Sequence, residues 1–201
     1  MVIFYGSPHS SATRTHWLLE ELGIPYEYRK IDTSKPRAER GEEFRQVSPM
    51  AKVPAIVDGD VRLIESSAIN MYLAEKYGAG KLGPGNEGER ARMGQWSVWG
   101  FANVMPLLIA ILYHTKLLPE AERRADEAKN NRQWAAEYLA ILEPVLHKGE
   151  WLVGGRFSVA DVTLGSIVDF AAGLGVELTP AVKTWLERLR ARPAYRKVHA
   201  G

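Results

Sequence analysis

The chain has 201 residues, of which 46% are hydrophobic and 25% are charged, a length and composition that suit one large or two small globular domains. Its formal net charge is only +2 at pH 7, and the charges form no basic stripe, so we expect no nucleic-acid partner. It contains no cysteine, which excludes disulfides, thiolate metal sites and a thiol nucleophile of its own.

The N-terminal part of the chain alternates between short strands and helices. Apolar runs closed by turn residues predict strands, and apolar residues at helical spacing predict helices. In chain order we expect a strand at 2–5, a helix ending at Gly23, a strand at 26–31, a short helix at 37–46, a hairpin of strands 54–57 and 61–64, and a helix after Ser66. Parallel strands need a long crossover and a hairpin does not, so we expect a mixed sheet in one α/β domain over residues 1–77.

The glycine-rich stretch 78–85 breaks all periodicity and is interpreted as a linker, after which no strand is predicted. Residues 86–201 are therefore expected to form an all-helical domain. Asn86 with Glu89, and Ser158 with Asp161, have the spacing of helix N-terminal capping boxes. The expected helices are a long one from Asn86 that Pro106 kinks, one from about Pro119 towards Leu146, one from Val159 to about Ala172, one at 180–190, and a terminal turn at 193–199.

Segments for targeting, membrane insertion and metal binding are not expected. The N-terminal residues become polar too early for a signal peptide, and no apolar run approaches the roughly 18 residues of a membrane span. The five histidines lack metal-ligand spacing. We therefore expect a soluble, cytoplasmic protein without a metal or a membrane partner.

Glu65 and Ser66 lie between the predicted hairpin and the helix that follows it. Free backbone N–H groups and the helix dipole favour an anion at such a helix start. Ser66 is suited to bind a ligand carboxylate and Glu65 a ligand ammonium, so the pair suits a group that carries both charges on one carbon. The alternative is that Ser66 is an ordinary N-cap with an incidental acid beside it.

Three motifs resemble those of the glutathione S-transferase family, and the resemblance covers the whole chain. SPMAKVPAIVDGDVRLIESSAINMYLAEKYG resembles its thioredoxin-like region, RFSVADVTLGSIV resembles the capped helix of its all-helical domain, and RARPAYRKV resembles a frequent closing segment. The implied fold is an α/β thioredoxin-like domain followed by an all-α domain. Ala51 departs from the family pattern, because many members have glycine there.

The resemblance implies glutathione as co-substrate, and it assigns roles to the residues around the hairpin. Glu65 and Ser66 would bind the γ-glutamyl end of the tripeptide. A cis peptide bond before Pro54 would let the backbone of Val53 pair with the cysteinyl residue like an added strand. Lys52 lies close enough in sequence to reach the glycyl carboxylate.

A hydroxyl group near the thiol is expected to stabilise the thiolate. A free thiol has a pKa of about 8.5, and lowering it by about two units requires roughly 2.7 kcal/mol. Serine-type family members place the donor shortly after the loop proline and a few residues before an arginine, an arrangement that Ser10 fits best and Ser11 nearly as well. Ser7 and Tyr5 remain alternatives, and the other interpretation of Ser10 or Ser11 is that it only caps the first helix.

An apolar pocket for a small-molecule electrophile is expected from the loop residue His9 and from Phe101, Met105, Leu108 and Tyr113 on the long helix. As a helical stripe, the last four are also typical of core residues. The resemblance also implies a homodimer. The leading hypothesis is a glutathione transferase active in detoxification; the alternatives are a non-catalytic glutathione-binding or scaffolding protein and a glutathione-dependent disulfide or peroxide reductase.

Overall fold

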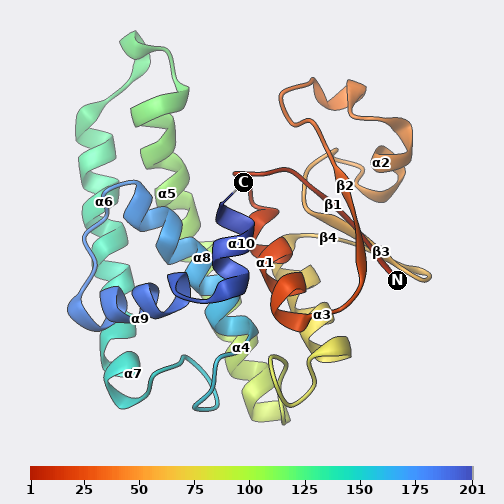
Figure 1. Ribbon diagram of the computed structural model, residues 1–201. Helices are drawn as coiled ribbons and strands as arrows, with labels where there is room; N and C mark the ends of the chain where they lie inside the picture. The colour runs from red at the N-terminus through yellow and green to blue at the C-terminus, as the bar shows by residue number, and fades with distance from the viewer. Residues whose placement is uncertain (201) are drawn as a thin grey trace. The chain divides into compact units, whose positions relative to one another are not determined.

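The computed structural model describes residues 1–200 (Figure 1). The chain forms two compact units. The first contains Met1–Gly85 together with the C-terminal helix, and the second contains Asn86–Arg190. The sequence pattern assigns everything after residue 85 to the helical domain, whereas in the structure the segment that begins at Ala191 belongs to the first unit.

The first unit is built on a four-stranded mixed sheet, in agreement with the predicted fold class. Its strand order is β2-β1-β3-β4, with β1 parallel to β2 and antiparallel to β3, and with β3 antiparallel to β4. The elements are β1 (Val2–Gly6), α1 (Thr13–Leu22), β2 (Tyr26–Lys30), a 3₁₀ turn (Arg37–Glu39), α2 (Glu42–Val47), β3 (Ala55–Asp58), β4 (Val61–Ile64), α3 (Ser66–Tyr77) and α10 (Pro193–His199).

Helices cover both faces of this sheet. Figure 1 shows α1 and α3 on one side and α2 on the other. Successive side chains of a strand point to opposite faces, so Tyr5 and Ala55 pack with Phe44 and Val47 of α2. Phe4 faces the other way and its ring stacks on that of Tyr28 at 5.1 Å.

The C-terminal helix α10 packs beside α1, as Figure 1 shows in blue and red. The rings of Trp17 and Tyr195 meet edge to face at 5.1 Å. Arg192 donates to both carboxylate oxygens of Glu21, at 2.6 and 2.8 Å. The terminal turn predicted at 193–199 is thus a helix, held by contacts to residues about 170 positions earlier.

The second unit contains α4 (Glu87–Trp99), α5 (Met105–Leu112), α6 (Ala125–Leu139), α7 (Glu143–Lys148), α8 (Val159–Gly173) and α9 (Pro180–Arg190). Helix α4 continues through π-helical turns at Gly100–Val104 and Tyr113–Leu117, so the helix runs from Glu87 to Leu117. Pro106 lies in the first turn of α5, directly after the first of these wider turns, and does not end the helix.

The helix predicted from Pro119 to Leu146 is divided in the structure. A 3₁₀ turn occupies Glu120–Glu122 and α6 begins only at Ala125. At its other end a 3₁₀ turn at Ala140–Leu142 leads into α7, which has Pro144 in its first turn. Proline has no N–H for the regular helical bond, so it is suited to begin a new helix there.

Both predicted caps are confirmed. The side chain of Asn86 accepts from the backbone N–H of Glu89 at 2.9 Å. Ser158 and Asp161 form the reciprocal capping box of α8. The buried carboxylate of Asp161 also accepts from the backbone N–H of Leu152 and from the indole N–H of Trp185, both at 3.1 Å. Burial raises its pKa to about 6 against the opposing effect of these hydrogen bonds.

One helix among the described residues, Glu87–Leu117, is long and apolar enough to cross a membrane by length and composition alone. Its segment 93–115 contains no Asp, Glu, Lys or Arg, and polar residues limit its longest uninterrupted apolar run to residues 104–113. A single helix of this kind is weak evidence, because core helices of soluble proteins have the same character. Only 28% of its most apolar window is buried, and its exposed large side chains are Val98, Ile109, Tyr113 and Leu117.

Candidate functional site

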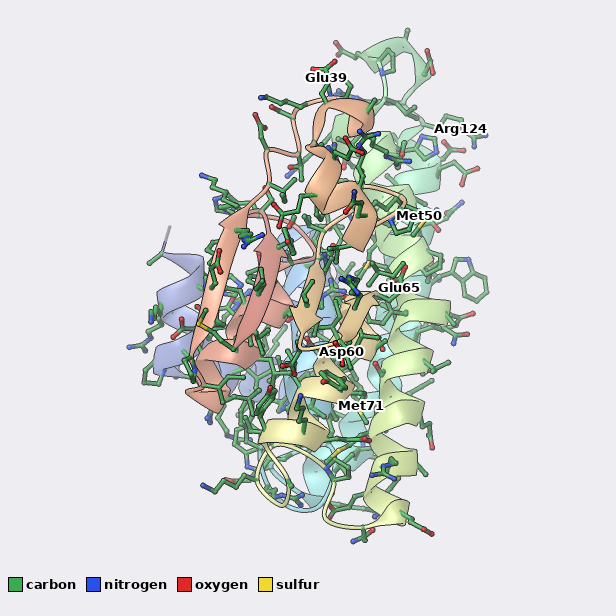
Figure 2. The ribbon with its side chains drawn as sticks, turned by 90° about the vertical axis from the view of Figure 1, so that its right-hand side faces the viewer. Glu39, Met50, Asp60, Glu65, Met71 and Arg124 are labelled. Carbon is green, nitrogen blue, oxygen red and sulfur yellow. The ribbon has the colours of Figure 1, made fainter. Side chains whose placement is uncertain are left out.

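The junction between β4 and α3 presents an acidic side chain above a helix start. Figure 2 labels Glu65 at this junction and Asp60 at the opposite end of β4. Glu65 is exposed and has a φ of 69°, in the left-handed region that an L-residue rarely adopts. It occupies the N-cap position of α3 but makes no side-chain capping bond, and Ser66 is the first helical residue. The alternative interpretation of Ser66 as an ordinary N-cap is therefore wrong.

Two buried polar contacts join α1 to the start of α3. The guanidinium Nη1 of Arg14 donates to the hydroxyl oxygen of Ser66 at 3.3 Å, and the hydroxyl of Thr15 donates to the amide oxygen of Asn70 at 2.9 Å. Burial lowers the pKa of Arg14 to about 10, so the guanidinium stays protonated at neutral pH. A cation thus lies directly behind the residue predicted to bind an anion.

The predicted cis peptide bond between Val53 and Pro54 is present. The carbonyl oxygen of Val53 accepts from the hydroxyl of Ser11 at 2.8 Å. The preceding turn is held by Ser48, whose hydroxyl oxygen accepts from the backbone N–H of Lys52 at 3.1 Å and whose hydroxyl donates to the Lys52 carbonyl at 2.8 Å. The Lys52 side chain is exposed.

The conformation of this turn explains why glycine is suited to position 51. Ala51 has a φ of 49°, in the left-handed region, and its methyl group is buried. An L-residue there carries a strain on the order of 1 kcal/mol relative to glycine. The departure from the family pattern therefore leaves the shape of the turn compatible with the cis bond two residues later.

The loop before α1 brings the candidate hydroxyls to different surroundings. Ser10 accepts from the backbone N–H of Ala12 at 3.1 Å and donates to the carbonyl of Ser7 at 2.6 Å. Ser11 is exposed and bonded to Val53 as described above. His9 is exposed and has a φ of 53°.

Tyr5 is buried on the α2 side of the sheet. Its hydroxyl donates to a carboxylate oxygen of Glu43 at 3.1 Å and accepts from Arg29 at 3.0 Å. The pKa of the Tyr5 hydroxyl is raised, mainly by burial and to a smaller extent by the bond to Glu43. The Tyr5 hydroxyl is thus engaged by two partners on the α2 side of the sheet.

Arg40 was not predicted as part of the site, yet it connects three parts of the surrounding loop. Its guanidinium donates to the carbonyl oxygens of Thr33 at 2.6 Å, Lys35 at 3.0 Å and Ala51 at 2.8 Å. In the sequence it is one arginine within a charged stretch, so no local pattern distinguishes it.

The four predicted pocket residues of the long helix do not share one environment. Leu108 is completely buried and belongs to the core of the helical unit, so it offers no surface to a ligand. Tyr113 is exposed, and Phe101 and Met105 are half-buried. Within residues 1–200, no group of three or more His, Asp or Glu side chains is arranged to hold a metal ion.

Comparison with known proteins covers nearly the whole chain. The family model described as "Glutathione S-transferase, N-terminal domain" matches residues 1–75, and "Glutathione S-transferase, C-terminal domain" matches residues 103–193. Glutathione S-transferase F10 of Arabidopsis thaliana is 30% identical, over 100% of this chain and 97% of the plant protein. Disulfide-bond oxidoreductase YfcG of Escherichia coli K12 is 32% identical, over 96% of this chain and 92% of YfcG.

A solved structure resembles the chain at similar coverage. The theta class glutathione S-transferase from Xanthomonas axonopodis pv. citri, crystallised with glutathione bound, superposes with a TM-score of 0.87 at 28% identity. The comparison covers 100% of this chain and 97% of the bacterial enzyme. Both family models, the relatives and the fold agree, and the chain belongs to the glutathione S-transferase family of enzymes.

Proposed function

We propose that the first unit binds glutathione along the edge formed by Val53, Glu65 and Ser66. The observation that carries this proposal is the junction of β4 and α3, where an exposed carboxylate stands beside a hydroxyl at a helix start. The γ-glutamyl group has an ammonium that suits Glu65 and a carboxylate that suits the hydroxyl of Ser66 and the positive end of the α3 dipole. The backbone of Val53 would pair with the cysteinyl residue, and Lys52 would attract the glycyl carboxylate.

The hydroxyl of Ser10 is our candidate donor to the glutathione thiolate. Its oxygen already accepts the backbone N–H of Ala12, the N-cap residue of α1, and this polarises the hydroxyl and makes it a stronger donor. To donate to the thiolate, the hydroxyl would give up its hydrogen bond to the carbonyl of Ser7 and form one to the sulfur instead. Ser11 is the second candidate, because its contact with the Val53 carbonyl brings it beside the backbone that would hold the cysteinyl residue.

The proposed reaction is attack of the glutathione sulfur on an electrophilic small molecule. The thiol loses its proton to solvent, the thiolate forms a carbon–sulfur bond, and the leaving group departs with the bonding electrons. His9, Phe101, Met105 and Tyr113 remain the candidates for contact with this second substrate. A role in detoxification in the cytoplasm fits such chemistry and forms part of the proposal.

Disulfide reduction is the second candidate function, because one similar protein is named a disulfide-bond oxidoreductase. This chain has no cysteine, so glutathione would supply both sulfurs. The first glutathione thiolate would attack the disulfide, form a mixed disulfide and release one substrate thiol. A second glutathione thiolate would then attack the glutathione sulfur of the mixed disulfide, which forms glutathione disulfide and releases the second substrate thiol.

Binding of glutathione is tested by calorimetry on the wild type, Glu65→Gln and, as matched control, Asp60→Asn. The control removes an exposed acid at the other end of β4. Loss of one charge-assisted bond is expected to weaken binding by about tenfold in Glu65→Gln, with less than a twofold change in the control. Equal affinities for the two variants would refute the assignment, and tight binding without turnover of any electrophile or disulfide would favour a scaffolding protein.

We also propose a homodimer that covers the exposed aliphatic side chains of the long helix, Val98, Ile109 and Leu117. These residues recur at roughly helical spacing along one continuous helix, and water-exposed side chains of this size are a liability in a monomer. Sedimentation is expected to give twice the chain mass, and Ile109→Glu is expected to produce monomers. A monomeric wild type at micromolar concentration would refute the proposal.

A further inference from the structure

Arg14 is the buried cation nearest to the proposed γ-glutamyl site. It is only 7% exposed, although it lies in the first turn of α1. Its Nη1 reaches the hydroxyl oxygen of Ser66, a residue 52 positions later that is itself 4% exposed. This contact is therefore shielded from water, and bonds to a charged donor are strong in such surroundings.

The direction of this bond restricts the hydroxyl proton of Ser66. A guanidinium only donates, so the serine oxygen must be the acceptor of the bond from Arg14. The one hydroxyl proton then points away from the guanidinium, since the positive charge repels it. A ligand carboxylate on the far side of Ser66 would meet an oriented and polarised donor.

We propose, on the basis of the glutathione site proposed above, that Arg14 is a positioning residue that turns the Ser66 hydroxyl towards the γ-glutamyl carboxylate. Arg14 does not touch the tripeptide. Cation, hydroxyl and carboxylate form a row in which the serine accepts from one side and donates to the other.

A second buried contact between the same helices provides a control that distinguishes this positioning role from simple packing. The bond from Thr15 to Asn70 already fastens α1 to α3 one turn further along. It is a neutral pair, with Thr15 next to Arg14 on α1 and Asn70 four residues after Ser66 on α3. Thr15→Val therefore disturbs the same interface without altering the charge behind Ser66, which makes it the matched control.

The test compares two ligands in calorimetry. One is glutathione, and the other is 4-aminobutyryl-cysteinyl-glycine, which keeps the ammonium, the thiol and the glycyl end but lacks the γ-glutamyl carboxylate. In Arg14→Met we expect affinity for glutathione to fall by about tenfold and affinity for the analogue to change by less than twofold. In Thr15→Val we expect both affinities to change by the same factor.

Equal losses for the two ligands in Arg14→Met, or no loss for either, would overturn the role of Arg14. If Arg14→Met does not fold, Arg14→Lys gives the same comparison. Its affinity for glutathione is expected to fall below that of the wild type by less than tenfold. A wild type that binds both ligands equally well would instead refute the proposed γ-glutamyl site itself. The two failures are thus distinguishable.

Discussion

Replacing Ser10 by alanine tests whether its hydroxyl stabilises the glutathione thiolate or only holds the loop before α1. In the structure the Ser10 hydroxyl makes two short-range bonds, accepting from Ala12 and donating to Ser7. Their loss is expected to cost about 1 kcal/mol of stability, as for other side-chain bonds at helix starts. A hydrogen bond to a charged sulfur contributes about 1.5 kcal/mol, which corresponds to about one unit of thiol pKa.

The assay is the ultraviolet absorbance of the thiolate in the enzyme–glutathione complex, followed as a function of pH. We expect the pKa of the bound thiol to rise by about one unit in Ser10→Ala, with about tenfold less thiolate at a pH below both values. Ser11→Ala is the control, with a bound thiol like that of the wild type. An unchanged thiol pKa in Ser10→Ala would refute the assignment, and a raised pKa in Ser11→Ala alone would transfer the role to Ser11.

Asp161→Asn, measured by denaturant unfolding at pH 8, is expected to cost about 2–3 kcal/mol because the amide cannot accept from all the buried donors around it. Asp169→Asn on the same helix, where the half-buried carboxylate pairs with the exposed Arg190, is expected to cost less than about 1 kcal/mol; similar costs would contradict this reasoning. Burial lowers the pKa of His16 in the folded protein, so the free energy of unfolding of the wild type is expected to fall as pH drops below about 6.5. His16→Gln is expected to lack this pH-dependent loss, and stability curves of the two proteins that run parallel from pH 7.5 to pH 5 would refute the role of His16. Asp58→Asn weakens bonds from two tyrosine hydroxyls and a lysine ammonium of α3 and is expected to cost about 1–2 kcal/mol, and a melting temperature equal to that of the wild type would argue against this anchoring.

Features that depend on neighbouring residues were predictable from the sequence. The hairpin around Gly59 follows from turn chemistry between two apolar runs, and the caps at Asn86 and Ser158 follow from a spacing of three residues. The mixed sheet follows from the lengths of the connections, because a parallel pair needs a crossover.

Features that depend on distant residues were not predictable in this way. Arg14 and Ser66 are 52 positions apart, and nothing in either segment indicates that one donates to the other. Arg40 is one of several exposed-looking charges until its three carbonyl partners are known. Leu108 shows the limit of helical periodicity, which gives the side of a helix a residue lies on but not whether a neighbouring helix or a ligand covers that side.

The position of α10 has a consequence for biosynthesis. Helix α1 is translated before every other helix of the first unit, whereas α10, which carries the partner of Trp17, is translated after the whole second unit. Nascent chains acquire structure from the N-terminus onward, so the apolar surface at Trp17 stays uncovered until α10 has been translated. Truncation of the chain shortly before Pro193 would thus destabilise the first unit, although its sheet and its other helices would be intact in sequence.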